Sequence, residues 1–259
     1  MTGASFGLEG VSVRFGSFAA LADVDLRVDA GEAVALVGPS GSGKTTLLRA
    51  LNGTVRPSAG AVRVDGARLD EVSRRRLREI RSRLGFVPQD LALVPNLRVV
   101  QNVLSGRLGR WSFLGAARAL VAPPRALVRE VHALLDRVGV AEKLYQRTDR
   151  LSGGQQQRVA VARALFQEPS GLLADEPVSS VDPARARDTV RLLTELSTER
   201  RITLVMSLHN LELARAAFPR LVGLRRGRVV FDAPSADVPA DAFEALYDLT
   251  TEELLGDGA

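Results

Sequence analysis

Residues 38 to 45 combine three glycines with a lysine and a threonine in the spacing G-x-x-x-x-G-K-T. The apolar run AVALV precedes this segment and TLLRAL follows it, so we expect a strand, a tight turn and the start of a helix. Backbone N–H groups of such a turn point toward one centre, and glycine has no Cβ to keep a phosphate away. The pattern therefore predicts a loop that binds the phosphates of a nucleotide.

This phosphate loop is expected to bind ATP and Mg²⁺ through several kinds of group. The ammonium of Lys44 would reach the β- and γ-phosphates, and the hydroxyl of Thr45 would bind Mg²⁺. Lys44 is also unusual in the chain, because only two of its 35 basic residues are lysines. The residues of the loop expected to contact ATP are Gly38, Pro39, Ser40, Gly41, Ser42, Gly43, Lys44, Thr45 and Thr46.

Two adjacent carboxylates, Asp175 and Glu176, follow the apolar stretch GLLA. At the end of a strand such a pair can divide the work of phosphate hydrolysis. Asp175 would hold Mg²⁺, directly or through water, while Glu176 would polarise the water that attacks the γ-phosphate. By itself the pair is more typical of a solvated turn, so this assignment requires the phosphate loop beside it. Gly171 is an imperfection in the expected strand, because glycine weakens a buried strand.

His209 ends a third apolar stretch, ITLVMSL. A single histidine is more often structural or simply exposed. At the end of a strand that lies beside the phosphate loop, however, it becomes a hydrogen-bond partner for the γ-phosphate. It could then report whether that phosphate is present.

A second glycine-rich helix start, the signature segment LSGGQ at residues 151–155, lies more than a hundred residues after the phosphate loop. A serine hydroxyl and the free N–H groups of a helix N-terminus also bind phosphate. One chain thus carries two phosphate-binding segments. If each faced a different nucleotide, two copies of the chain would hold two ATP molecules between them in a symmetric dimer.

These groups can act together only if the fold brings them together. The phosphate loop, the carboxylate pair and His209 each follow a short, uninterrupted apolar stretch, and helical patterns separate the three stretches. Such strands indicate a parallel sheet that is covered on both faces. Ligands of these sheets bind beyond the carboxyl ends of the strands. If the three strands are neighbours, their polar ends meet at one edge.

The order of these motifs resembles that of the ATP-binding cassette (ABC) ATPases over almost the whole chain. The motifs that carry the resemblance are Phe15, GPSGSGKTT, Gln89 in GFVPQD, LSGGQ, LLADEP, SSVDP with Asp182, and SLHN with His209. The resemblance implies an α/β fold: a P-loop NTPase (RecA-like) core with a parallel sheet, an antiparallel β subdomain and a helical subdomain. It also implies ATP hydrolysis coupled to transmembrane transport.

The resemblance also assigns roles to single residues. Glu176, His209 and Gln89 form the implied catalytic set, and Gln89 senses both Mg²⁺ and the attacking water. Asp182 communicates across the dimer, and the residues Ser152, Gly153, Gly154 and Gln155 complete the ATP site of the partner chain. Phe15 stands where an adenine-stacking aromatic is expected.

Phe15 has a second interpretation from its own neighbourhood. Val11, Val13 and Phe15 alternate onto one face of the expected strand, so Phe15 could equally belong to the core.

We expect residues 1–259 to form a single ABC ATPase domain. Residues 1–35 and roughly 60–70 resemble short strands with turns and would form the β subdomain. Helical patterns dominate from about 91 to 157, the expected helical subdomain, where Leu127, Val131, Leu134, Leu135 and Val138 keep helical spacing. Residues 236–259 form an acidic C-terminal extension that resembles one or two short helices.

Composition limits the partners. No window reaches the roughly 18 uninterrupted apolar residues of a membrane span, so a transporter would need two separate permease subunits and, indirectly, an external solute-binding protein. The expected location is the cytoplasmic face of the inner membrane. The absence of cysteine excludes disulfides and thiolate metal sites.

The net charge of +5 conceals a more basic body, because residues 229–259 hold eight acidic residues and no basic one. A basic body is compatible with nucleic acid or an anionic membrane surface. The only tight basic cluster is SRRRLREIRSR, so a scattered basic surface is the simpler interpretation and we expect no nucleic-acid partner.

Other classes within the family remain to be weighed. DNA-repair ATPases insert a long coiled coil before the signature segment, whereas only 61 residues separate Gln89 from Leu151 here. Translation-associated members usually carry two cassettes, and this chain has one. A regulatory ATPase that signals from a membrane complex stays open as an alternative.

Among importers, the chain resembles the phosphonate-type ATPases, a group that also handles phosphite and related phosphorus oxyanions. The segments that carry this resemblance are QNVLSGRLGRWSFLG, YQRTDRLSGGQQQRVAVARAL and VGLRRGRVVFDAP. The segment around Trp111 is the most distinctive, although Trp111 and Phe113 could simply pack the helical subdomain. ATPases of phosphate, amino-acid and other importers remain alternatives.

Overall fold

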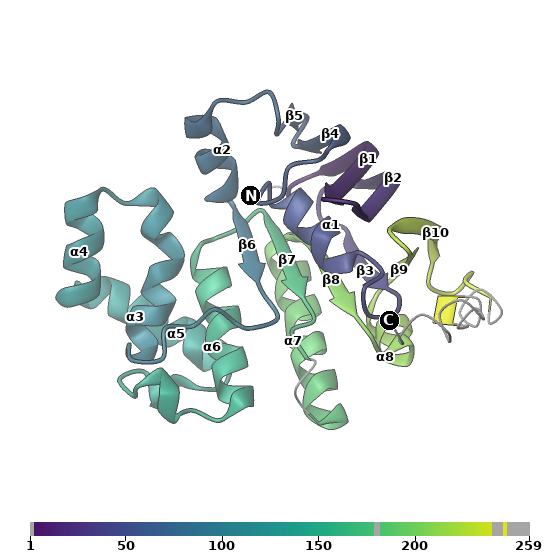
Figure 1. The fold of residues 1–259 in the computed structure, drawn as a ribbon. Coiled ribbons are helices and arrows are strands. Elements are labelled where there is room, and N and C mark those ends of the chain that lie inside the picture. Colours follow the sequence, from purple (N-terminus) through teal and green to yellow (C-terminus); the bar gives the residue numbers. More distant parts are fainter. Residues whose placement is uncertain (1–2, 179–181, 240–245, 248–259) are drawn as a thin grey trace.

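A six-stranded sheet forms the centre of the structure, a computed structural model that describes residues 3–178, 182–239 and 246–247 (Figure 1). In the order in which they lie side by side, its strands are β10 (Arg228–Pro234), β9 (Arg220–Arg225), β3 (Ala33–Val37), β8 (Thr203–Leu208), β7 (Gly171–Asp175) and β6 (Leu84–Val87). All neighbours are parallel except β10, which pairs with β9 in the antiparallel sense. The predicted parallel sheet is confirmed, with one antiparallel strand added at its edge.

The three strands that end in polar residues are neighbours, which fulfils the condition that the sequence left open. β8 lies between β3 and β7, with Val37 opposite Leu208 and Asp175 opposite Ser207. Parallel strands carry their carboxyl ends to the same edge of a sheet. The phosphate loop after β3, Glu176 after β7 and His209 after β8 therefore meet there.

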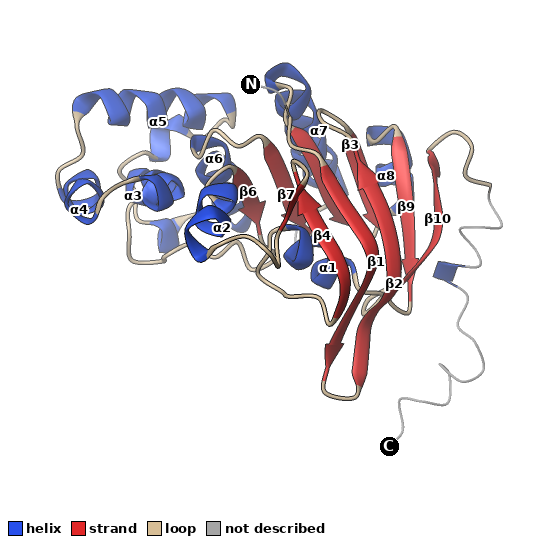
Figure 2. Cartoon of the chain, turned by 90° about the horizontal axis from the view of Figure 1, so that it is seen from above, coloured by secondary structure: helices blue, strands red, loops and turns tan. Residues whose placement is uncertain are grey.

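A second, antiparallel sheet lies across the first (Figure 2). Its strands lie in the order β2 (Phe18–Val28), β1 (Phe6–Phe15), β4 (Ala59–Val64) and β5 (Ala67–Arg68). Strands β1 and β2 are ten and eleven residues long, which is longer than the short strands expected from the sequence. They form a hairpin whose end carries Phe15 opposite Phe18 beyond the core. Phe15 is 55% exposed, so the alternative that placed it in the core is wrong.

Alternation along the central strands divides the interior into two cores. In β3, Val34 and Leu36 face the core shared with the second sheet and helix α1 (Lys44–Leu51), whereas Ala35 and Val37 face the helices on the other side. Figure 2 shows helices α7 (Pro183–Arg200) and α8 (Leu211–Ala217) on that other side of the sheet. Burial on both faces explains why these strands are apolar without interruption.

The segment predicted to be helical contains most of the remaining helices. They are α3 (Val99–Leu104), η1 (Ser105–Arg110), α4 (Phe113–Val121), α5 (Arg125–Arg137), η2 (Ala141–Lys143), η3 (Thr148–Arg150) and α6 (Gly153–Phe166), while α2 (Arg74–Arg81) precedes β6. In α5 the expected apolar positions Val131, Leu134 and Leu135 are buried. Helix α6 begins inside the predicted segment and continues to Phe166, where it packs on the central sheet.

Gly171 is required by the packing, in contrast to the sequence interpretation that treated it as a weakness. A Cβ at this position would lie 2.7 Å from Cζ of Phe6 and 3.0 Å from Cδ2 of Leu84. Both neighbours are almost fully buried. Glycine at the start of β7 therefore makes room for the ring of Phe6.

Two further expectations concern the ends of the chain and the membrane. Most of the predicted acidic extension, residues 236–259, lies outside the described residues, but Leu246 is 1% exposed and joins the core on the α7 and α8 side. Within the part of the chain that the structure describes, no helix combines the length and the apolar content needed to cross a bilayer.

Candidate nucleotide site

The phosphate loop owes its shape to its three glycines. Gly38, Gly41 and Gly43 have φ of 150°, 76° and 107°, a region that favours glycine. A Cβ on Gly38 would lie 2.1 Å from the carbonyl oxygen of Leu224, and one on Gly43 would lie 2.7 Å from that of Ala20. Gly41 has no atom within 4 Å of such a Cβ. Gly38 and Gly43 thus allow the loop to lie directly against neighbouring backbone, whereas Gly41 has open space where a side chain would be.

Lys44, the first residue of α1, is held at the centre of this loop. Its ammonium donates to the carbonyl oxygens of Gly38 at 2.8 Å and Pro39 at 2.9 Å, and its Nζ lies 3.8 Å from Oε1 of Glu176. The side chain is only 3% exposed. Burial lowers the pKa of Lys44, and the charges of Glu176 and Asp175 oppose that shift. The loop therefore encloses a largely desolvated cation.

Asp175 lies at the end of β7 and is 2% exposed. One of its oxygens, Oδ1, accepts a hydrogen bond from Thr45 Oγ1 at 3.0 Å and another from Ser207 Oγ at 2.9 Å. The structure thus brings together Thr45 and Asp175, two of the three residues expected to bind Mg²⁺, the third being Gln89. Both supply the hard oxygen ligands that Mg²⁺ prefers.

Glu176 has a left-handed backbone conformation, with φ of 45°, which is uncommon for a residue other than glycine. Its N–H donates to Ser207 Oγ at 2.9 Å. The carboxylate oxygen Oε1 lies 2.6 Å from Nε2 of His209 and 3.8 Å from Nζ of Lys44. The carboxylate is 10% exposed, whereas the His209 side chain is 40% exposed. Three segments that are far apart in sequence thus converge on one carboxylate.

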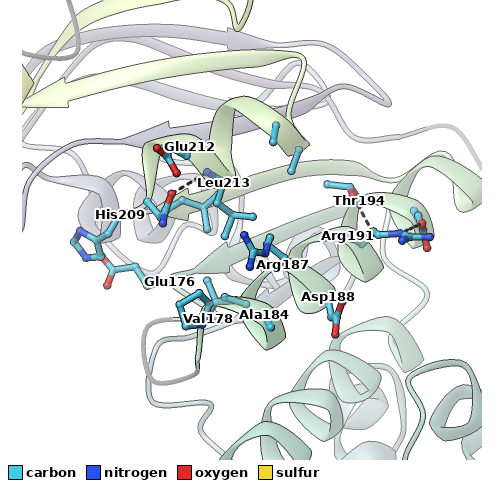
Figure 3. A pocket seen from close by; sticks show the side chains of 17 residues that line it. Glu176, Val178, Ala184, Arg187, Asp188, Arg191, Thr194, His209, Glu212 and Leu213 are labelled. Atoms are coloured by element: carbon cyan, nitrogen blue, oxygen red, sulfur yellow. Dashed lines mark hydrogen bonds and ion pairs between the residues drawn. The ribbon is translucent and has the colours of Figure 1, made fainter. Parts of the chain in front are cut away.

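A cavity of about 1050 Å³ extends from this carboxylate between α7 and α8. Figure 3 shows Glu176 and His209 beside each other at one end of it, and Arg187 in its middle. No residue of the phosphate loop lines this cavity. The cavity is therefore formed by α7, α8 and the residues that precede them, and not by the loop.

The signature segment does not contact the phosphate loop within this chain. Ser152 begins α6, and its hydroxyl accepts from Gln155 N at 3.4 Å while Gln155 Oε1 accepts from Ser152 N at 3.1 Å. Figure 1 shows the starts of α6 and α1 well apart. A Cβ on Gly153 or Gly154 would have no atom within 4 Å. Nothing in the described part of this chain therefore requires glycine at these two positions.

Within the described ranges, no hydrogen bond or ion pair joins three of the predicted residues to the site. Gln89 is exposed on the turn after β6, at the carboxyl edge of the sheet. Asp182 caps the N-terminus of α7, where its carboxylate accepts from Arg185 N at 3.0 Å. Phe15, as described above, is exposed at the tip of the β1–β2 hairpin. The roles expected for these three residues remain predictions.

The residues present fit a nucleotide phosphate and a magnesium ion. Ser42 Oγ is buried and has no hydrogen-bond partner among the described residues, so a donor stands free beside Lys44. No group of three or more His, Asp or Glu side chains in the described residues could hold a metal alone. Mg²⁺ is commonly bound by one or two carboxylates together with water and substrate phosphates, so Thr45 and Asp175 form a suitable partial set.

Sequence reasoning missed two residues of the site. Ser207 is fully buried and bonds to both residues of the carboxylate pair. The available signal was a hydroxyl in the apolar run LVMSL, two residues before His209. Tyr247 donates to the carbonyl oxygen of His209 at 3.3 Å. Burial and the charge of Glu176 raise the pKa of Tyr247, and the N–H of Gly38 acts against them. No local pattern connected Tyr247 with the nucleotide site.

Comparison with known families identifies the chain. The ABC transporter family matches residues 21–179. The chain belongs to this family. It is an ABC-type ATPase that binds ATP, and the α/β fold with a parallel core sheet that the sequence predicted is confirmed.

Three known proteins illustrate the relationship. A protein of Pseudomonas fluorescens named "Phosphonates import ATP-binding protein PhnC" is 48% identical over 88% of this ABC ATPase and 85% of its own length. One of Frankia casuarinae with the same name is 49% identical over 89% of the chain and 90% of its own length. A solved dimeric ATP-binding cassette in a post-hydrolysis state with ADP and Pi has a TM-score of 0.72 at 31% identity, and the match covers 89% of this chain and 98% of that one.

Proposed function

We propose that this ABC ATPase energises the import of phosphonates or related phosphorus oxyanions through a membrane complex. Relatives that carry the phosphonate import name are 48% and 49% identical to it over most of its length. The single observation that carries the ATPase chemistry is the convergence of Lys44, Asp175, Glu176 and His209 at one edge of the sheet.

ATP hydrolysis is assigned to this cluster. Lys44 and the loop N–H groups bind the phosphates, and Glu176 accepts a proton from the attacking water. His209 lies 2.6 Å from Glu176 and orients that carboxylate. Thr45, Asp175 and Gln89 would hold Mg²⁺, which neutralises charge on the phosphates when bound.

Each complete site is proposed to need two copies of the chain. Gly153 and Gly154 have open space around them, so their lack of side chains suits the close approach of a ligand from outside the chain. Ser152 and the N–H groups at the start of α6 would bind the phosphate of an ATP held by the partner's phosphate loop. The dimeric state of the solved relative with ADP and Pi supports this arrangement.

Mixing two inactive variants tests the two-chain site. Ser152→Arg blocks the signature segment and Lys44→Ala removes the ammonium of the phosphate loop, so each homodimer is expected to be inactive. A heterodimer retains one intact composite site, and mixing should restore ATP hydrolysis. Failure to recover activity at any mixing ratio would contradict the two-chain site, provided that native mass spectrometry detects the heterodimer.

The membrane partners are proposed to be two permease subunits that bind the helical region at the cytoplasmic face, with an external solute-binding protein acting through them. Trp111 packs into the helical core, but Phe113, Leu114 and Val121 on α4 are 87%, 79% and 85% exposed. Packing of the helical region therefore accounts for Trp111 and not for Phe113. Exposed apolar side chains that gather on one short helix are typical of a protein contact.

Transport by the reconstituted complex tests the substrate. When the complex is reconstituted in vesicles and ATP is supplied on its cytoplasmic side, a labelled phosphonate should accumulate on that same side. Unlabelled phosphite should inhibit this uptake more strongly than phosphate does. A complex with Glu176→Gln serves as the control without turnover. Uptake of phosphate or an amino acid in place of the phosphonate would refute the proposed substrate class and leave the ATPase assignment intact.

A further inference from the structure

Ser207 lies on β8, between β3, which precedes the phosphate loop, and β7, which ends at Asp175. It is 0% exposed. Its hydroxyl donates to Asp175 Oδ1 at 2.9 Å and accepts from the N–H of Glu176 at 2.9 Å. One side chain is therefore hydrogen bonded to two consecutive residues that are assigned different tasks.

The bond to Glu176 supplies a hydrogen-bond acceptor for a backbone N–H that lies just beyond the end of β7. The ladder between β7 and β8 ends at the pair Asp175 and Ser207, and the next residue turns into the left-handed region with φ of 45°. The N–H of Glu176 is therefore turned out of the ladder in a buried place, where an unpaired donor is costly. The Ser207 hydroxyl replaces the missing carbonyl and holds this peptide in its unusual conformation.

The bond to Asp175 orients the other carboxylate. Ser207 and Thr45 both donate to Oδ1. No hydrogen bond to Oδ2 occurs within the described ranges, so this second oxygen is available to a cation. Fixing one oxygen by two donors sets the direction in which the other points.

We propose that Ser207 is a positioning residue that fixes the spacing between the magnesium carboxylate, Asp175, and the catalytic carboxylate, Glu176. The proposal rests on the roles assigned to those two residues above. The hydroxyl itself touches neither nucleotide nor metal. It acts by making the two carboxylates a single rigid unit with β8, whose end also carries His209.

The proposal predicts a separation of rate from binding. Ser207→Ala removes both hydrogen bonds, so kcat for ATP hydrolysis should fall about 10- to 100-fold. The KM for ATP should change less than about threefold, because the donors of the phosphate loop are untouched. The Mg²⁺ concentration for half-maximal activity should rise, since Asp175 loses one of the two donors that orient it.

Thr203 offers a matched control on the same strand. It is also 0% exposed, and its hydroxyl likewise makes two bonds, donating to Ala4 O at 2.5 Å and accepting from Gly31 N at 2.8 Å. It lies at the opposite end of β8, away from the site. Thr203→Val should lower thermal stability to a degree similar to Ser207→Ala, yet leave kcat and the Mg²⁺ dependence unchanged.

A second pair of variants keeps the test decisive if Ser207→Ala folds poorly. Ser207→Thr retains the hydroxyl and Ser207→Val lacks it, while the two side chains have nearly the same shape. The full-length protein with threonine should keep at least about ten times the kcat of the one with valine. Equal kcat in these two variants would overturn the proposal.

The remaining outcomes are also informative. A Ser207→Ala protein that keeps kcat within about threefold of wild type, or a Thr203→Val protein that loses as much kcat as Ser207→Ala, would show that the hydroxyl is merely structural. Glu176→Gln separates this failure from a wrong active site. If Glu176→Gln is inactive while Ser207→Ala is active, only the role of Ser207 is refuted. If Glu176→Gln stays active, the assigned base is wrong and the positioning role is refuted with it.

Discussion

Replacing Glu176 by glutamine removes one charge from the centre of the site and changes little else. The amide has nearly the same shape, and the backbone N–H of residue 176 can still donate to Ser207 Oγ. The substitution removes the carboxylate that lies 2.6 Å from His209 and 3.8 Å from Lys44. Its effects on catalysis and on nucleotide binding should therefore have opposite signs.

The rate should fall because an amide cannot accept the proton of the attacking water. General-base catalysis contributes roughly 10²- to 10⁴-fold, which corresponds to about 3 to 5 kcal/mol of the activation free energy. We therefore expect kcat to drop by at least about 100-fold.

ATP binding should be retained or strengthened. At 3.8 Å and an effective dielectric constant near 20, the gross attraction between the charges of Lys44 and Glu176 is about 4 kcal/mol. Without this partner the buried Lys44 cation is less well compensated, so the nucleotide-free protein should lose stability. The phosphates of ATP then supply the missing negative charge, and the thermal shift caused by ATP should be larger than in the wild type.

Phosphate release, ATP calorimetry and thermal unfolding with and without ATP measure these three quantities. Glu195→Gln is the matched control, because Glu195 is an exposed carboxylate that lines the same cavity and forms an ion pair with Arg191. It should leave all three unchanged. A Glu176→Gln protein whose kcat stays within about tenfold of wild type, or whose ATP affinity falls in parallel with kcat, would refute the assignment of Glu176 as the base.

Three further predictions follow from single contacts. Lys44→Ala removes charge-assisted hydrogen bonds to phosphate, so calorimetry should show the ATP dissociation constant rising by about 100-fold or more, and unchanged affinity would contradict the phosphate loop. Gly171→Ala forces a Cβ to within 2.7 Å of the Phe6 ring, so denaturant titration should show a loss of about 1 to 3 kcal/mol. An unaltered midpoint would contradict that packing. The pKa of Tyr247 is raised above its ordinary value of 10.0 in the folded protein. The contribution of the neutral hydroxyl to the free energy of unfolding is therefore complete below pH 10.0 and is lost as the pH rises through the folded-state pKa. Wild type should therefore lose more thermal stability than Tyr247→Phe between pH 9 and 11, whereas parallel curves would count against the Tyr247 contact.

Local sequence patterns were sufficient to predict structure where the conformation of a segment depends on residues within that segment. The phosphate loop, the apolar strands and the helical spacing of α5 depend on residues that lie within a few positions of each other. Their geometry follows from glycine conformations, hydrogen-bond directions and the periods of strands and helices. The parallel sheet followed from them, whereas the meeting of Lys44, Asp175, Glu176 and His209 at one edge also required β3, β8 and β7 to be neighbours, which the structure shows.

Contacts between distant segments were beyond such patterns. Alternation allowed Phe15 to be a core residue, but the β1–β2 hairpin extends past the core and leaves it exposed. Gly171 resembled a defect in the sequence, but in the structure the ring of Phe6, 165 positions earlier, occupies the space that a larger side chain at position 171 would need. Phe113 could have packed like Trp111, yet α4 turns it outward.

The amino-acid sequence by itself identified the phosphate loop, the carboxylate pair and the signature segment as candidates for phosphate chemistry, because each is a contiguous motif whose donors and acceptors lie within a few positions of each other. Only the tertiary structure decided how the two carboxylates are held. The hydroxyl of Ser207 reaches the carboxylate of Asp175 and the backbone N–H of Glu176 across a strand pairing in which Ser207 lies opposite Asp175, 32 positions earlier. A hydrogen bond across a sheet depends on which strands become neighbours and in which register, and that choice is made by the whole core.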